Sequence, residues 1–376
     1  MLTKPELVIV LMLLLMSGCT PPGPRTGPAA TMPARLATAP PALSLQPTVS
    51  ALPEEPITFV YTGLKGGIYQ VTLSGQKREI VPPDGVLKRV IAWSPDRKYL
   101  SYIAVEFPSE GMRETLWMVD ASGANARRLM GPVKALRYAW EENGRAIYVE
   151  EAISFQRIPF DEGTVVRACV VDLDTGAVQT TAERVGWFPS SSRSPDGNWA
   201  VWPDLTNGKC TLYLLDREGN KRRTIYQPPA GYCTGGVWAP DGQRVAIFRP
   251  EDEEIYAYDV MSDRWVKVSS LSTTHRDYLV AFMQWSPDGE WLSYTLTDQR
   301  YVNALCVLRV GDGSERCFDV RWISNRFAWS HDSRYIAYLA KSSSQENDLF
   351  AVNVLDGVIT NLTRDGSAIV EDEVAP

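Results

Sequence analysis

One short stretch, Trp285-Ser286-Pro287-Asp288-Gly289, limits the folds open to this chain, because edited copies of it recur along most of the sequence. Apolar residues lead into and out of it, while Pro, Asp and Gly are the residues that tight turns require. Each copy therefore predicts two antiparallel strands joined by a hairpin. The Trp ends the incoming strand, where we expect it to fill the gap between neighbouring sheets.

Six copies follow one another roughly 45 to 50 residues apart. Five begin with a Trp, and these are Trp93, Trp140, Trp238, Trp285 and Trp329. The copy after Trp140 begins with Arg193 instead. The turn aspartates are Asp96, Asp196, Asp241, Asp288 and Asp332. Because one role is repeated from copy to copy, these residues are expected to be structural rather than catalytic.

A second turn, Asp-x-x-Gly, follows a further apolar strand inside the units, as in Leu116 to Gly123, Cys169 to Gly176 and Leu212 to Gly219. With the alternating segment after it, each unit supplies four strands. A period of this length with four strands per unit is typical of propeller blades. The chain is therefore predicted to be an all-β propeller of four-stranded antiparallel blades.

The pattern Trp-Ser-Pro-Asp-Gly-x-x-Ile/Leu-x-Tyr resembles the repeat of TolB-like propellers. The same repeat occurs in the propeller domains of prolyl oligopeptidase-type and tricorn-type peptidases. The resemblance covers roughly Ile57 to the C-terminus. It implies the fold and says little about function, because propellers of this kind support unrelated activities.

The two ends of the repeat region are incomplete in complementary ways. Ile57 to Tyr61, Ile68 to Leu73 and Lys77 to Val81 indicate three strands without an inner one, and Ala368 to Val374 indicates a strand without a blade. An open ring would expose two sheet edges. We therefore predict seven blades, with the C-terminal strand completing the blade that the N-terminal strands begin.

The first residues resemble an export signal followed by a lipobox. A short apolar run, Leu7 to Met16, is too short to span a bilayer and suits a signal peptide. Small residues then precede Cys19, which the resemblance makes the lipidated residue of a bacterial lipoprotein. We predict a signal peptide over 1–18, a Pro/Ala/Thr-rich tether over 19–56 and the propeller over 57–376. An ordinary secretory signal with an incidental Cys is the alternative.

Five cysteines follow the lipobox, and an exported protein meets oxidising surroundings. Cys306 and Cys317 flank a turn on neighbouring strands, so a disulfide between them is expected. Cys210 and Cys233 form a second possible pair. Cys169 is expected to be a buried, unpaired residue. None of these spacings resembles a zinc site, and neither a metal nor a cofactor is expected.

The search for chemistry yields only weak candidates. Arg89, Arg137 and Arg326 precede motif tryptophans on inner strands and could make the tunnel mouth cationic, although pairing with local carboxylates is the simpler expectation. Possible partner contacts on loops are Phe155, Phe160 and His275. No Gly-x-Ser-x-Gly elbow or phosphate-binding loop occurs. A net charge of −7 and the lack of long basic clusters argue against nucleic acid as a partner.

These observations favour a non-enzymatic binding or scaffold propeller, anchored by lipid in the bacterial envelope, with a protein partner. Glycan binding, or an enzyme that uses the tunnel, such as a metal-dependent lactonase or a lyase, is the alternative. An enzyme of that kind needs carboxylates, Asn or His that converge at one tunnel mouth. The sequence indicates no such set, and it leaves the oligomeric state open.

Overall fold

A computed structural model describes residues 57–141, 144–154, 165–185, 193–206, 209–216, 219–229, 235–249, 251, 253–270, 279–297, 302–320, 323–342, 347–366, 368 and 374–375. The chain divides into two units, Met1–Leu52 and Pro53–Pro376, and every described residue belongs to the second. The proposed signal peptide, Cys19 and the tether lie outside the described residues. In the part that is described, no helix is long and apolar enough to cross a membrane.

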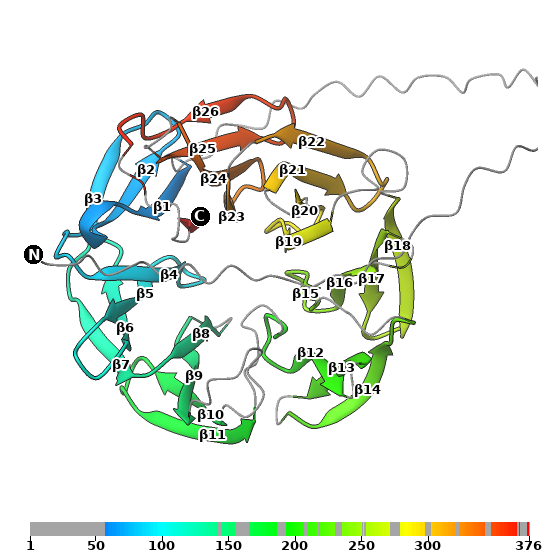
Figure 1. Ribbon diagram of the computed structural model, residues 1–376, viewed down its shortest axis with the longest axis horizontal. Coiled ribbons are helices and arrows are strands. Elements are labelled where there is room, and N and C mark those ends of the chain that lie inside the picture. The colour runs from blue at the N-terminus through cyan, green and yellow to red at the C-terminus, as the bar shows by residue number, and fades with distance from the viewer. Residues whose placement is uncertain are drawn as a thin grey trace, which may run out of the picture. The chain divides into compact units, whose positions relative to one another are not determined.

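Seven antiparallel sheets follow one another around a ring, which confirms the predicted seven-bladed propeller (Figure 1). Blade 1 runs outwards through β27 (Val374–Ala375), β1 (Thr58–Thr62), β2 (Ile68–Thr72) and β3 (Lys77–Val81), with η1 (Leu64–Gly66) between β1 and β2. Blade 2 contains β4 (Leu87–Trp93), β5 (Tyr99–Glu106), β6 (Arg113–Asp120) and β7 (Arg127–Val133). Blade 3 contains β8 (Leu136–Trp140), β9 (Ala146–Ser154), β10 (Val165–Asp172) and β11 (Val178–Val185).

The remaining blades follow the same order, with one departure in blade 4. Blade 4 contains β12 (Trp199–Thr206), β13 (Lys209–Asp216) and β14 (Lys221–Tyr226). Blade 5 contains β15 (Val237–Trp238), β16 (Arg244–Arg249), β17 (Glu254–Asp259) and β18 (Arg264–Ser270). Blade 6 contains β19 (Leu279–Trp285), β20 (Trp291–Thr297), β21 (Val302–Arg309) and β22 (Glu315–Asp319). Blade 7 contains β23 (Ile323–Trp329), β24 (Tyr335–Lys341), β25 (Asn347–Asn353) and β26 (Ile359–Asn361).

Blade 4 is three-stranded among the described residues, whereas four strands were predicted for every blade. In place of an inner strand it shows a single β-bridge between Arg193 and Ala200 of β12. The chain just before Arg193, residues 186–192, lies outside the described residues.

The motif turns are held by the side chains that the sequence singled out. In blade 6, the Trp291 backbone N–H donates to the Ser286 hydroxyl (2.9 Å), and the Glu290 N–H donates to the Asp288 carboxylate (2.9 Å). Gly289 has a φ of +69°, a conformation that glycine adopts without strain. Since this pattern recurs in other blades, the turns form a firmly hydrogen-bonded set on one face of the ring. We call this face the turn side.

Three motif tryptophans, Trp140, Trp285 and Trp329, lie in the gaps between blades. Trp329 of blade 7 is 1% exposed and donates through Nε1 to the Ser293 hydroxyl of blade 6 (2.8 Å). Trp285 of blade 6 reaches the Val237 carbonyl of blade 5 (3.1 Å), and Trp140 of blade 3 reaches Ser101 of blade 2 (2.8 Å). Each ring therefore buries apolar area at a blade junction and also satisfies its polar N–H there.

Apolar packing at the blade junctions forms most of the core. Six large clusters of buried residues each join two neighbouring blades among the described parts of the chain. The junction between blades 3 and 4 differs. On its two sides the described clusters are small: Ala152 with Val166 in blade 3, and Ala200 with Leu215 in blade 4. This junction is the one whose motif copy carries Arg193 in place of a Trp.

The ring closes where the two ends of the repeat region meet, as predicted. β27 pairs antiparallel with β1, with Val60 opposite Ala375 and Tyr61 opposite Val374. Among the described residues, β27 covers Val374–Ala375 at the end of the predicted Ala368 to Val374, and Ala368 forms a β-bridge with Gly63; residues 369–373 lie outside the described part of the chain. Pairing of the C-terminal segment with blade 1 is therefore described near both ends of the predicted strand, at Ala368 and at Val374–Ala375.

The carboxylate of Asp348 fixes the chain that leads to this closure. Asp348 lies in β25 and is 2% exposed. It accepts hydrogen bonds from the Thr363 hydroxyl (2.7 Å), the Asn361 amide (2.9 Å) and the Gly366 backbone N–H (2.9 Å). Burial alone would raise the pKa of Asp348, but these donors outweigh it and hold the pKa below its ordinary value.

Candidate functional site

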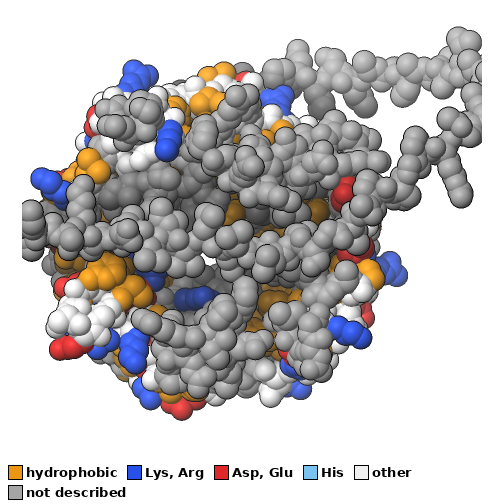
Figure 2. Space-filling view, viewed as in Figure 1, with side chains coloured by type: hydrophobic (Ala, Val, Ile, Leu, Met, Phe, Trp, Pro, Cys, Tyr) orange, Lys and Arg blue, Asp and Glu red, His pale blue; other side chains and the backbone are white. Residues whose placement is uncertain are grey.

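A cavity of about 400 Å³ opens on the turn side, where the inner ends of four successive blades meet. Its wall combines aromatic, apolar, acidic and basic side chains from blades 3 to 6. The lining residues are Ala139, Trp140, Glu141, Tyr148, Arg193, Ser194, Pro195, Asp196, Gly197, Val237, Trp238, Pro240, Met283, Gln284 and Trp285. Figure 2 shows basic and hydrophobic side chains within the central hollow of the ring. The size is typical of pockets that take a small ligand or a short segment of chain.

Arg193 is the charged centre of this cavity. It occupies the position that Trp holds in five other copies, and its guanidinium lies over the Tyr148 ring of blade 3, 4.0 Å from the ring centroid. Its Nη2 donates to the Gly197 carbonyl within its own turn (2.9 Å). A cation over an aromatic ring thus takes the place of an apolar wedge, and space remains beside it.

The groups next to Arg193 are already committed to other partners. Burial would raise the pKa of Asp196, but the Ser194 hydroxyl and the Asn198 backbone and side-chain donors outweigh it and lower that pKa. Asp196 therefore stays ionised and serves its turn. The Tyr148 hydroxyl donates to Glu150 (2.9 Å), a carboxylate that is 1% exposed.

Much of the cavity wall is rigid, since it is built from turns and strand ends. Trp238 and Trp285 are 8% and 5% exposed, so their rings are largely covered. Met283 lies within a bulge in β19 and Gln284 follows it, because the pairing with β20 shifts register between Ala281 and Gln284. The preceding residue, Phe282, has a φ of +49° and is half exposed. A bulky residue in this region of backbone space is strained, and such strain is common where a protein binds something.

The arginines singled out from the sequence do not gather at this cavity. Arg89 pairs with Glu114, whose fully buried carboxylate also accepts the Leu136 backbone N–H (2.6 Å). The Arg89–Glu114 pair lies within blade 2, and the hydrogen bond from Leu136 to Glu114 ties blade 2 to blade 3. Arg137 also has interaction partners of its own, and the side chain of Arg326 lies outside the described part of the structure. Arg89 is therefore paired with a carboxylate of its own blade, in line with the simpler expectation for these arginines.

Three further candidates cannot be placed at a site. Phe155, Phe160 and His275 lie within 155–164 and 271–278, outside the described residues. In the described parts of the chain, no three His, Cys, Asp or Glu side chains come together in a way that could hold a metal ion.

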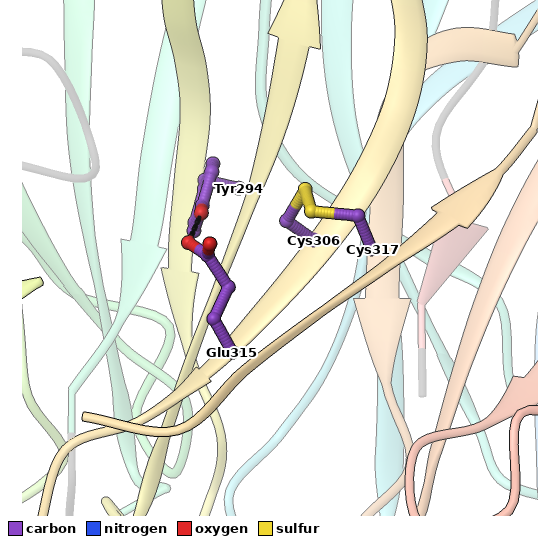
Figure 3. Close-up of a disulfide and its surroundings, with 4 residues drawn as sticks. All are labelled: Tyr294, Cys306, Glu315 and Cys317. Atoms are coloured by element: carbon purple, nitrogen blue, oxygen red, sulfur yellow. Dashed lines mark hydrogen bonds between the residues drawn. A yellow bond between two sulfur atoms is a disulfide. The ribbon is translucent and has the colours of Figure 1, made fainter. Parts of the chain in front are cut away.

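The cysteines are structural in the described part of the chain. Cys306 and Cys317 form a disulfide between β21 and β22, beside the hydrogen bond from Tyr294 to Glu315 (Figure 3). Cys210 is also disulfide-bonded, and Cys233, its expected partner, lies outside the described residues. Cys169 is free and buried, and burial raises the pKa of its thiol. A thiol with a raised pKa is a poor nucleophile at neutral pH.

Sequence reasoning missed Arg193 as a site residue. The signal was available, because this copy alone begins with a cation while the others begin with Trp. A search for repeats depends on the positions that match, so the one copy without a Trp was counted as a repeat and its Arg was not considered further. In a scaffold built from repeats, departures from the consensus are where individual function is carried.

Comparison with known proteins supports the fold. No family model and no curated protein sequence matches the chain. Among solved structures, TolB from Acinetobacter baumannii is 15% identical with a TM-score of 0.51, over 84% of this chain and 80% of that one. An oligogalacturonate lyase from Vibrio parahaemolyticus is 13% identical with a TM-score of 0.55, over 84% and 89%.

A puromycin-hydrolyzing peptidase from Mycobacterium tuberculosis is 13% identical with a TM-score of 0.55, over 84% of this chain and 54% of the peptidase. This chain therefore spans about half of the peptidase. The structural likeness supports the fold, a TolB-like propeller. At identities this low it leaves the activity open, because one fold supports unrelated functions.

Proposed function

We propose that this TolB-like propeller is a binding protein of the bacterial cell envelope, anchored by lipid on Cys19, that takes a protein partner at the cavity on the turn side. The observation that carries the proposal is the cavity itself. Residues from four blades line it, and its wall is built from hydrogen-bonded turns and strand ends. A preformed site of this kind binds without a large ordering cost.

Anchorage rests on the sequence. Small residues before Cys19 follow a short apolar run, and a Pro-rich tether separates that Cys from the first strand of the ring. Two or three acyl chains hold a protein firmly at a membrane, at about 0.8 kcal/mol per buried methylene. A tether then leaves the ring free to meet a partner beside the membrane.

Site-specific photocrosslinking in cells tests the binding site. A photoreactive residue at Gln284, an exposed part of the cavity wall, is expected to capture one defined partner. The same residue at Val266, which is 59% exposed on the outer strand of blade 5, is the matched control. Equal capture at both positions, or capture at neither, would overturn the proposal.

Fractionation tests the anchor independently. The full chain is expected in the membrane fraction, and Cys19→Ala is expected to release it, because the thiol that carries the lipid is lost. Labelled palmitate should enter only the wild-type protein. A Cys19→Ala protein that stays in the membrane fraction and still takes up label would contradict lipid attachment at this residue.

A second candidate is a lyase that acts on acidic sugars. The likeness to oligogalacturonate lyase spans 89% of that enzyme, and the cavity places Arg193 near Glu141 and Asp196. Incubation with oligogalacturonates, followed by the ultraviolet absorbance of an unsaturated product, distinguishes the two. Turnover that disappears in Arg193→Gln would favour the lyase over the binding protein.

A further inference from the structure

Arg193 keeps most of its hydrogen-bonding capacity unused. A guanidinium has five N–H donors in one plane. Among the described residues, one donor meets the Gly197 carbonyl, and the Tyr148 ring covers one face of the group. What remains is the in-plane edge, in a cavity large enough to hold a ligand. A carboxylate is the group that matches this edge with two parallel hydrogen bonds.

Among the described residues of the cavity wall, neither of the two carboxylates is paired with Arg193. Asp196 is held by Ser194 and Asn198, and Glu141 has its own interaction partner. Arg244 provides a useful contrast on the same side of the ring. It also lies over an aromatic ring, that of Trp285 (4.9 Å), but its Nε is bound by Asp241 (2.6 Å). Arg244 is therefore neutralised where Arg193 is not.

The remaining wall of the cavity is suited to an apolar group. Val237, Pro240 and Met283 line it beside Arg193. A sugar usually stacks on an exposed aromatic face, whereas the faces of Trp238 and Trp285 are largely buried here. The wall therefore favours a branched or aromatic side chain over a sugar ring.

We infer that the cavity binds the free C-terminus of a partner polypeptide, with its terminal carboxylate on Arg193 and an apolar last side chain against Met283, Val237 and Pro240. The last residue of a chain bears a carboxylate and a side chain on the same carbon, so it can present both groups to one cavity. An internal Asp or Glu offers the carboxylate without the apolar neighbour. This inference rests on the proposed binding function and names the part of the partner that is recognised.

Binding of a matched peptide pair to the purified propeller tests the inference. The peptide Gly-Ser-Ala-Leu-Phe, labelled at its N-terminus, is used with a free carboxylate and with an amidated C-terminus, and fluorescence anisotropy reports binding. The free acid is expected to bind at least roughly tenfold more tightly than the amide. Arg193→Gln should remove that difference, Arg193→Lys should retain part of it, and Arg244→Gln should leave it unchanged.

A second variant keeps the test valid if Arg193→Gln does not fold. Met283→Glu places a like charge in the cavity and should weaken the free acid much more than the amide. Equal affinity for acid and amide in the wild type would overturn the inference, as would tighter binding of galacturonate than of the peptide. A crosslink at Gln284 that persists unchanged in Arg193→Gln would also overturn it, while leaving the proposed function intact.

Discussion

Replacing Asp348 with Ala is expected to loosen the closure of the ring. Its carboxylate holds Asn361, Thr363 and the Gly366 N–H, which lie on the chain that runs from β26 towards β27. Without the carboxylate these donors lose their acceptor in a region where Thr363 is 6% exposed. The chain segment that delivers the closing strand would then be less well fixed.

The size of the effect follows from these contacts. A hydrogen bond to a charged group contributes about 1.5–3 kcal/mol, and burying the charge offsets part of the total. With three strong donors the net loss should be about 3 kcal/mol. If the denaturant slope is about 3 kcal/mol/M in urea, the midpoint of unfolding falls by about 1 M.

Urea unfolding followed by tryptophan fluorescence measures this shift. Asp356→Ala is the matched control, because Asp356 lies in an exposed turn of the same blade and, among the described residues, its side chain accepts only the Val358 N–H (2.8 Å). The control should lose less than about 1 kcal/mol. If Asp348→Ala cost no more than Asp356→Ala, the assigned role in closure would be wrong.

The same residue gives a pH dependence with a definite sign. The pKa of Asp348 is lowered in the folded protein, so its contribution to stability is complete above the unfolded value of 3.8. It declines as the pH falls below that value and is lost below the folded pKa. The stability difference between wild type and Asp348→Asn should therefore be constant near neutral pH and shrink in acid. A difference that grows in acid would contradict the assignment.

Two further predictions concern the blade junctions and the disulfide. Trp329→Phe should lower the free energy of unfolding by about 1–2 kcal/mol, because the hydrogen bond to Ser293 is lost. Trp93→Phe should cost less, because the buried Nε1 of Trp93 has no partner among the described residues. Equal costs of the two variants in urea unfolding would refute this reasoning. Replacing Cys306 and Cys317 together by Ala should cost about 3 kcal/mol, the entropy of the loop they close, and a reductant should destabilise only the wild type. A double variant as stable as the oxidised wild type would contradict that role.

The general fold could be predicted because it depends on local chemistry that recurs. Each Ser-Pro-Asp-Gly copy predicts a hairpin turn from its own residues, and the Trp before it predicts a junction between blades. The count of copies and the complementary ends at Ile57 and Ala368 then predict a closed seven-bladed ring. One departure among the described residues is in blade 4, where a single β-bridge at Arg193 stands in place of the predicted inner strand.

The candidate site was harder to predict because it depends on contacts between separate strands, some within a blade and others between blades. Arg89 finds its carboxylate on another strand, at Glu114, and nothing near Arg89 in the sequence indicates that pair. Arg193 matters because Tyr148, from the preceding blade, lies beneath it. Such neighbours follow from the register of each sheet and the angle between blades. A repeat period cannot supply either.

Closure by β27 also constrains when the ring can close during synthesis of the chain. Almost the whole chain separates β1 from β27, so the innermost position of blade 1 stays vacant until the ribosome has made the polypeptide as far as Ala375. Contacts this distant in sequence form late and slowly. Until then the inner edge of β1 is unpaired, and a chain that ends before β27 would keep that edge exposed. A chain that lacks β27 is therefore expected to associate through this edge more readily than the full-length chain.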